Sequence, residues 1–224
     1  MTVVERTLSV VEPDLRELVR GLQPGESCSL DRPVTVEEFC ELDEEDGNLE
    51  LVNGVIYMVP PPTDAHEDAY GWLFKVIGQY VEARALGKVR GSRSGVRVSP
   101  TSLPEPDLLF FRTEHLDRLK PSGVHGPPDF AIEIDDSNRA RLDAVRKQSQ
   151  YADAGVTELW VVDLPRRELR HFLLEEGVYR RLEVDPEGEV EARTVEGLRL
   201  TVAWLFQGPG FPSSLEVVTA LLAR

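Results

Sequence analysis

The stretch PDFAIEIDDSN, residues 128–138, decides the fold that we predict for this chain. Its centre, FAIEI at 130–134, is an apolar run of strand length and is typical of a buried β-strand. Helical spacing follows over 138–154 and ends at Gly155, and ELWVV at 158–162 is typical of another strand. This order of strand, helix and strand predicts a sheet with a helix folded back over it.

Segments upstream and downstream extend this pattern. PDLLFF at 106–111 predicts another buried strand, and apolar spacing from Asp64 to Gly87 predicts a long helix. LELVNGVIY at 49–57 places two apolar runs around Asn-Gly, which is the strongest short signal of a β-hairpin. A further helix is expected over 214–222. We therefore predict an α/β (α+β) protein with a mixed sheet flanked by helices and with extra β-hairpins.

The distribution of charge divides the chain. It has 224 residues with 25 basic and 40 acidic side chains, a formal net charge of −15 at pH 7. Residues 1–50 hold a net charge of −10, whereas residues 51–160 are nearly neutral at −2. A polyanion is repelled by nucleic acid, but this uneven distribution leaves the central part compatible with DNA. We predict an acidic arm at 1–32, a main domain at 33–206 and a C-terminal helical tail at 207–224.

Composition also bears on location. The sequence has no long apolar segment and no basic N-terminus followed by an apolar run, so we expect neither a membrane span nor a signal peptide. A cytoplasmic location is the resulting expectation. Cys28 and Cys40 are too few for a disulfide framework and have no partners at metal-ligand spacing.

A basic run without acidic residues precedes the strand predicted at 106–111. It spans 83–97 and contains Arg84, Lys88, Arg90, Arg93 and Arg97. Cations on an exposed edge strand block unwanted strand pairing, and a strand that faces phosphate groups would use the same side chains. Both interpretations stay open from the sequence.

Three carboxylates stand where the local sequence favours burial. Asp107 begins one apolar strand, Glu133 lies inside another, and Glu50 interrupts the first run of the hairpin. A buried carboxylate needs a donor, a cation or a metal. Adjacent strands could bring Asp107 and Glu133 to one Mg²⁺, with the Ile134 carbonyl as a third oxygen, because Mg²⁺ prefers oxygen ligands. Alternatively, Glu133 faces solvent on a half-covered strand.

Lys147 lies on the helix that follows the Glu133 strand. It is one turn beyond Asp143 and one turn before Tyr151, so these three residues share a helix face. A helix folded over the sheet could direct the Lys147 ammonium toward the metal. The alternative is an Asp143–Lys147 pair at the surface, which contributes little.

These residues resemble a known family. PDLLFF, PDFAIEIDDSN, the spacing of Asp143, Lys147 and Tyr151, and ELWVVD are similar in order and spacing to the Uma2 (DUF820-like) family of restriction-endonuclease-like proteins, within the PD-(D/E)XK nuclease superfamily. The resemblance covers about 34–205. It implies a restriction-endonuclease-like core, with Asp107 and Glu133 as ligands of Mg²⁺ or Mn²⁺. It also implies Lys147 as the active-site lysine, displaced onto the helix, and Glu50 as an accessory acid.

The chain departs from the family pattern beside Glu133. The superfamily's lysine position is occupied by Asp135, and Asp135-Asp136-Ser137 stands where family members have an apolar residue followed by Ser-Pro. These acids could bind a second cation or repel a phosphate. His66, which opens the long helix, is a further accessory candidate.

Two functions remain open from the sequence. The first is a metal-dependent endonuclease that hydrolyses DNA phosphodiester bonds, with Arg90, Arg93 and Arg97 as phosphate contacts. The second is a catalytically inactive interaction protein that keeps the nuclease fold. In either case we expect a homodimer and no membrane partner.

Overall fold

The computed structural model describes residues 14–42, 46–91, 94–121, 123–136 and 140–224, with side chains from Lys147 onward in the last range. Its largest element is a six-stranded sheet in the order β11-β10-β9-β8-β5-β4. The strands are β4 (Gly87–Gly91), β5 (Leu108–Arg112), β8 (Phe130–Asp135), β9 (Glu158–Asp163), β10 (Glu168–Glu175) and β11 (Val178–Leu182). Because β8 and β9 pair in parallel while the flanking pairs are antiparallel, the sheet is mixed, as predicted.

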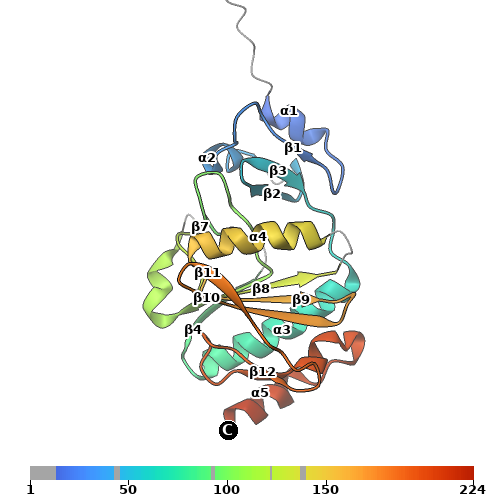
Figure 1. Cartoon of the computed structure of the whole chain (residues 1–224), viewed down its shortest axis with the longest axis vertical. Helices are drawn as coiled ribbons and strands as arrows, with labels where there is room; N and C mark the ends of the chain where they lie inside the picture. Colours follow the sequence, from blue (N-terminus) through green and yellow to red (C-terminus); the bar gives the residue numbers. More distant parts are fainter. Residues whose placement is uncertain (1–13, 43–45, 92–93, 122, 137–139) are drawn as a thin grey trace, which may run out of the picture.

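The parallel pair β8–β9 is joined by α4 (Ala140–Ala154), which lies over one face of the sheet (Figure 1). Gly155 ends this helix with a φ of 87°, and the Val156 amide donates to the Tyr151 carbonyl at 2.9 Å. The predicted order of strand, helix and strand is therefore confirmed.

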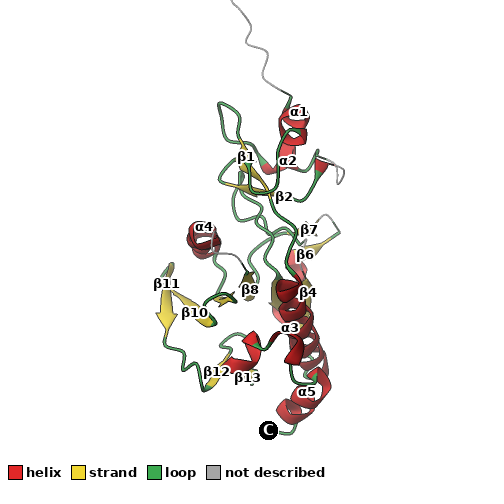
Figure 2. Cartoon of the chain, turned by 90° about the vertical axis from the view of Figure 1, so that its right-hand side faces the viewer, coloured by secondary structure: helices red, strands yellow, loops and turns green. Residues whose placement is uncertain are grey.

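The opposite face of the sheet is covered by α3 (Asp64–Ala83), and α5 (Ser214–Leu222) packs against α3 (Figures 1 and 2). Side chains of β8 alternate between the two faces: Ile132 and Ile134 pack in the core that contains α3, and Ala131 packs in the core under α4. By the same alternation, Glu133 faces α4. The sequence alternative of a solvent-facing Glu133 does not describe this structure.

The helix α3 begins one residue after Thr63, whose side chain accepts a hydrogen bond from the His66 amide. It ends at Ala83, earlier than the predicted end at Gly87, because Gly87 instead begins β4. A side chain could not stand there, since a Cβ atom would lie 1.9 Å from the Phe111 carbonyl oxygen of β5.

A smaller unit lies above α4, on the side of the sheet that this helix covers (Figures 1 and 2). It consists of α1 (Leu15–Arg20), β1 (Ser27–Cys28), α2 (Val36–Phe39), β2 (Leu49–Val52) and β3 (Val55–Met58), with strand order β1-β3-β2. We call it the N-terminal unit. The predicted hairpin is confirmed as β2–β3, and its turn residues Asn53 and Gly54 have φ values of 50° and 77°.

Residues 14–32 of the predicted arm pack within this N-terminal unit: Val19 of α1 is fully buried with Leu51 and Ile56 of the hairpin. At the other end of the chain, α5 packs against α3 and buries Val217, Val218 and Leu221. Both segments that we predicted as appendages thus contribute to packed cores.

Short elements complete the fold. They are η2 (Thr113–Arg118), β6 (Leu119–Lys120), β7 (Gly123–Val124), β12 (Glu189–Glu191), β13 (Arg199–Thr201), η3 (Val202–Phe206) and η4 (Gly208–Gly210). Within the described ranges, no helix combines the length and the apolar character needed to cross a bilayer.

Candidate active site

Asp107 and Glu133 lie side by side where β5 begins and β8 approaches its end. Leu108 pairs with Ile132 and Leu109 with Ala131, so the same register places Asp107 opposite Glu133, on the sheet face covered by α4. The Ile134 amide donates to Asp107 Oδ2 at 2.7 Å. In an extended strand the N–H and C=O of a residue point the same way, so the Ile134 carbonyl faces the Asp107 side as well.

The helix α4 supplies two groups to Glu133. The Tyr151 hydroxyl donates to Glu133 Oε1 at 2.5 Å, and Lys147 Nζ lies 3.5 Å from Glu133 Oε2. These two residues are one helical turn apart, so they reach the same carboxylate from above. The Lys147 side chain is only 13% exposed, whereas the alternative pair with Asp143 would place it at the surface. The Asp143 side chain lies outside the described residues.

Glu50 reaches the site from β2 of the N-terminal unit. Its Oε1 atom lies 2.9 Å from Lys147 Nζ and accepts a hydrogen bond from the Glu105 amide at 3.0 Å. The side chain is buried. The cluster is therefore assembled from both structural units of the chain.

His66 approaches Asp107 from the first turn of α3. Its Nε2 atom lies 3.1 Å from Asp107 Oδ1, and its Nδ1 atom lies 3.2 Å from Glu67 Oε1. Burial lowers the pKa of His66, but the hydrogen bond to Asp107 and the negative charge around it outweigh burial and raise the pKa to about 9. At neutral pH His66 is thus a cation paired with Asp107.

Burial dominates the ionisation of Glu133. It raises the pKa of Glu133 to about 8; the Lys147 ammonium opposes this shift, while the nearby charges of Asp107 and Glu50 add to it. Burial, followed by the nearby charges of Glu133 and Glu50, raises the pKa of Tyr151 well above its usual range, so its hydroxyl remains a donor. In the absence of a divalent cation, the site therefore disfavours simultaneous ionisation of Asp107, Glu133 and Glu50.

The two additional acids have partners away from this cluster. Asp135 Oδ2 lies 3.7 Å from an Arg170 guanidinium nitrogen, which is also 3.6 Å from Asp163 Oδ2 at the end of β9. Asp136 accepts hydrogen bonds from the amide and the hydroxyl of Thr63, at 3.0 and 2.8 Å, and so holds the start of α3. An arginine therefore partly compensates the charge of Asp135 beside Glu133.

The three predicted phosphate contacts are placed differently. Arg90 lies in β4 opposite Leu109, on the same sheet face as Asp107 and Glu133, as does Lys88 opposite Phe111. Arg97 forms an ion pair with Glu37 of α2 at 2.5 Å. Arg93 lies outside the described residues.

The donor set at Asp107 and Glu133 is suited to a hard cation. It offers two carboxylates and one carbonyl, and Mg²⁺ is commonly held by one or two carboxylates while waters complete its octahedron. Among the residues that the structure describes, no three His, Cys, Asp or Glu side chains are arranged as a ready metal cage. Asp107 and Glu133 can hold such an ion only if their contacts with His66 and Lys147 yield to it.

The fold and this cluster can be compared with known proteins. The family model of Uma2, described as "Putative restriction endonuclease", matches residues 36–203. The chain belongs to the Uma2 family. Among curated proteins none matches it.

A solved structure with the same fold as this Uma2 chain is among those that match it. It is described as "a putative nuclease belonging to DUF820" from Anabaena variabilis ATCC 29413. The two chains superpose with a TM-score of 0.65 and share 19% sequence identity over 78% of this chain and 98% of the other. The resemblance noted from the sequence is confirmed, and so is the predicted fold class.

Two contacts in the Uma2 site were not predicted from the sequence. Helical spacing placed Tyr151 on the face of Lys147, but it gave no reason for the hydroxyl to meet Glu133. The bond from the Glu105 amide to Glu50 depends on a loop, and no local pattern signals it. The spacing Lys147–Tyr151, read together with a buried Glu on the preceding strand, would have been the available signal.

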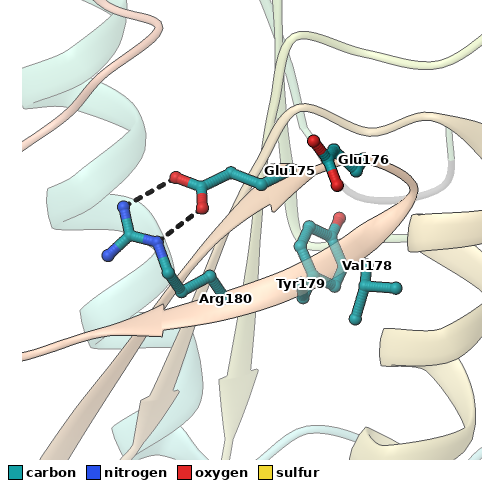
Figure 3. A pocket seen from close by; sticks show the side chains of 5 residues that line it. All are labelled: Glu175, Glu176, Val178, Tyr179 and Arg180. Carbon is teal, nitrogen blue, oxygen red and sulfur yellow. Dashed lines mark hydrogen bonds and ion pairs between the residues drawn. The ribbon is translucent and has the colours of Figure 1, made fainter.

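A surface hollow of this Uma2 chain lies at the turn between β10 and β11 (Figure 3). It is lined by Glu175, Glu176, Val178, Tyr179 and Arg180, and Glu175 and Arg180 form two hydrogen bonds of 2.7 Å. Because β10 pairs near this turn with the start of β9, the hollow lies at the opposite end of the sheet from Asp135 and Asp163. It contributes nothing to the carboxylate cluster.

Proposed function

We propose that this Uma2 chain is a metal-dependent endonuclease that hydrolyses DNA phosphodiester bonds. The observation that carries the proposal is the meeting of Asp107, Glu133 and Lys147 on one face of a nuclease-type sheet. A pair of adjacent carboxylates with a buried ammonium is the combination of groups that phosphoryl chemistry uses. The family description is consistent with this activity.

Each group has a distinct role in this proposal. Asp107, Glu133 and the Ile134 carbonyl would hold Mg²⁺, or Mn²⁺ in its place, and the ion would supply Lewis-acid activation of the phosphodiester. Lys147 would orient the attacking water or stabilise the negative charge that develops on the phosphoryl oxygens. His66 would leave Asp107 as the cation binds and be available to a phosphate oxygen.

Two basic residues on the sheet support a path for the proposed substrate. Arg90 and Lys88 lie on the edge strand β4, on the same face as the carboxylates and two strands away from Glu133. Phosphate groups that flank the scissile bond would pair with these cations. Arg97 would join them only after release from Glu37, and Arg93 stays a candidate from the sequence alone.

A second candidate is an inactive nuclease-fold protein that acts through association, with the homodimer as its form. One observation favours it: His66, Lys147 and Tyr151 already contact Asp107 and Glu133, so part of the negative charge of the cluster is compensated within the chain. In that case the cluster would serve stability and would not bind cations.

Cleavage assays on the full chain separate the two candidates. Supercoiled plasmid and single-stranded DNA are incubated with Mg²⁺ or Mn²⁺ and with wild type, Asp107→Asn or Glu133→Gln. Loss of at least about 100-fold in rate is expected for both variants, since each removes a ligand or its charge. Glu175→Gln, in an exposed ion pair far from the cluster, serves as the matched control. Equal cleavage by wild type and both site variants would disprove the proposal.

A further inference from the structure

Glu50 has a more specific task than that of an accessory acid. We infer that Glu50 is a positioning residue that holds Lys147 over the site and is not itself a metal ligand. The inference rests on the proposed nuclease function and assigns a role to the N-terminal unit within it.

The contacts of Lys147 favour Glu50 over Glu133. Its ammonium lies 2.9 Å from Glu50 Oε1, within normal hydrogen-bond distance, and 3.5 Å from Glu133 Oε2, at the outer limit. Glu133 also accepts the short bond from Tyr151 through its other oxygen. Glu50 is thus the close ionic partner of Lys147, and Glu133 is the more distant one.

Glu50 is fixed by a second donor. The Glu105 amide donates to the same Oε1 atom that meets Lys147, so two donors converge on one oxygen. Both charged side chains are largely buried, with 6% of Glu50 and 13% of Lys147 exposed. If Glu50 Oε1 turned toward a metal, the Glu105 amide would lose this acceptor and the Lys147 ammonium would lose its closer carboxylate, which is costly for groups that are largely shielded from water.

The backbone around Glu50 is anchored from both sides. Within β2 it pairs with Tyr57 of β3, and the next residue, Leu51, is fully buried. The Leu103 amide donates to the Leu51 carbonyl at 2.9 Å, which ties the loop that carries Glu105 to the same strand. The N-terminal unit therefore presents a rigid acceptor to Lys147, whose own helix belongs to the other unit.

A double-mutant cycle tests this role. Full-length wild type, Glu50→Gln, Lys147→Met and the double variant are compared by calorimetric titration with MnCl₂ and by single-turnover cleavage of plasmid DNA. If Glu50 acts through Lys147, Glu50→Gln lowers the rate by about 10–100-fold, leaves the Mn²⁺ affinity unchanged and has no further effect in the Lys147→Met background. Glu133→Gln, measured in parallel, abolishes Mn²⁺ binding.

Other outcomes overturn the inference. Loss of Mn²⁺ affinity in Glu50→Gln comparable to that in Glu133→Gln would make Glu50 a metal ligand. Additive rate effects of Glu50→Gln and Lys147→Met would show that the two residues act independently. If Glu50→Gln does not fold by circular dichroism, the cycle is run with Glu50→Asp, to which the same criteria apply. A wild-type chain that neither binds Mn²⁺ nor cleaves DNA would instead overturn the proposed function and this inference with it.

Discussion

Glu158 and Glu133 stand on neighbouring strands of one sheet, and their surroundings differ. Glu158, at the start of β9, is fully buried and accepts hydrogen bonds from the Trp160 indole, the Arg193 amide, and the amide and hydroxyl of Thr194. His171 Nε2 lies 2.8 Å from the same carboxylate. Glu133, near the end of β8, has one short donor, a more distant ammonium and two neighbouring carboxylates.

The difference separates a carboxylate with a structural role from one that is available for chemistry. A carboxylate saturated with donors has its hydrogen-bonding capacity satisfied and holds elements together. A carboxylate with few donors and like-charged neighbours has a raised pKa and an unmet demand for positive charge. Glu158 therefore fixes the loop at 193–194 onto the sheet, whereas Glu133 is the residue that a cation would stabilise.

The largest expected effect is on the structural side of this comparison. Glu158→Ala removes the carboxylate that accepts four hydrogen bonds and that lies beside His171. We therefore expect a loss of about 3–5 kcal/mol in the free energy of unfolding. Urea denaturation followed by circular dichroism measures it. A loss below about 1 kcal/mol would show that the donors find other partners and that the two glutamates do not differ as described.

The next effect concerns cation binding by the wild type. Protons compete with a cation for Glu133, whose pKa of about 8 keeps it mostly protonated at pH 6, and His66, with a pKa of about 9, competes for Asp107. Affinity for Mn²⁺ should therefore rise by up to about tenfold per pH unit between pH 6 and 8. Calorimetry in buffers of different ionisation enthalpy should also detect released protons. An affinity independent of pH would contradict this account.

A third test compares stability as a function of pH in metal-free buffer. Between pH 4.5 and 8 the unfolded chain loses the Glu133 proton while the folded chain retains it, so this residue makes stability fall as pH rises. Glu133→Gln should remove that part of the slope and exceed the wild type by on the order of 1 kcal/mol at pH 8. The difference between the two denaturation series isolates Glu133 from other titrating groups. A Glu133→Gln variant that is less stable at pH 8 would assign Glu133 to the structural class.

The smallest effect is expected at the hydroxyl of Tyr151. Tyr151→Phe keeps the buried ring and removes only the donor to Glu133, so it should cost about 1 kcal/mol of stability. Because the carboxylate is then less well oriented, Mn²⁺ affinity should fall by about tenfold. Thermal denaturation and titration with MnCl₂ measure the two quantities. Unchanged Mn²⁺ affinity would mean that Tyr151 serves packing alone.

Much of the fold could be predicted from local patterns. Asn53-Gly54 set the hairpin, helical spacing set α3 and α4, and apolar runs set β5, β8 and β9. Asp107 and Glu133 stood out because charged residues interrupt or begin apolar strands. These signals are local, so one sequence suffices to detect them.

The remaining contacts depend on tertiary packing. Arg170 meets Asp135 because β10 lies next to β9 in the sheet, and no spacing in the sequence indicates that proximity. The segment 14–32 has weak periodicity of its own, because its apolar side chains are completed by those of β2 and β3. For the same reason, no sign in the sequence indicated that the boundary predicted at residue 32 lies inside a packed core.

The contact between Glu50 and Lys147 also has a consequence for how the chain folds. Its two residues are far apart in the sequence and belong to different units, so forming it requires closure of a long loop after each unit has taken shape. Contacts within the hairpin and within the β8–α4–β9 unit are closer in sequence and can form earlier. We therefore expect the lysine–carboxylate cluster to be completed only when both units of the chain have come together.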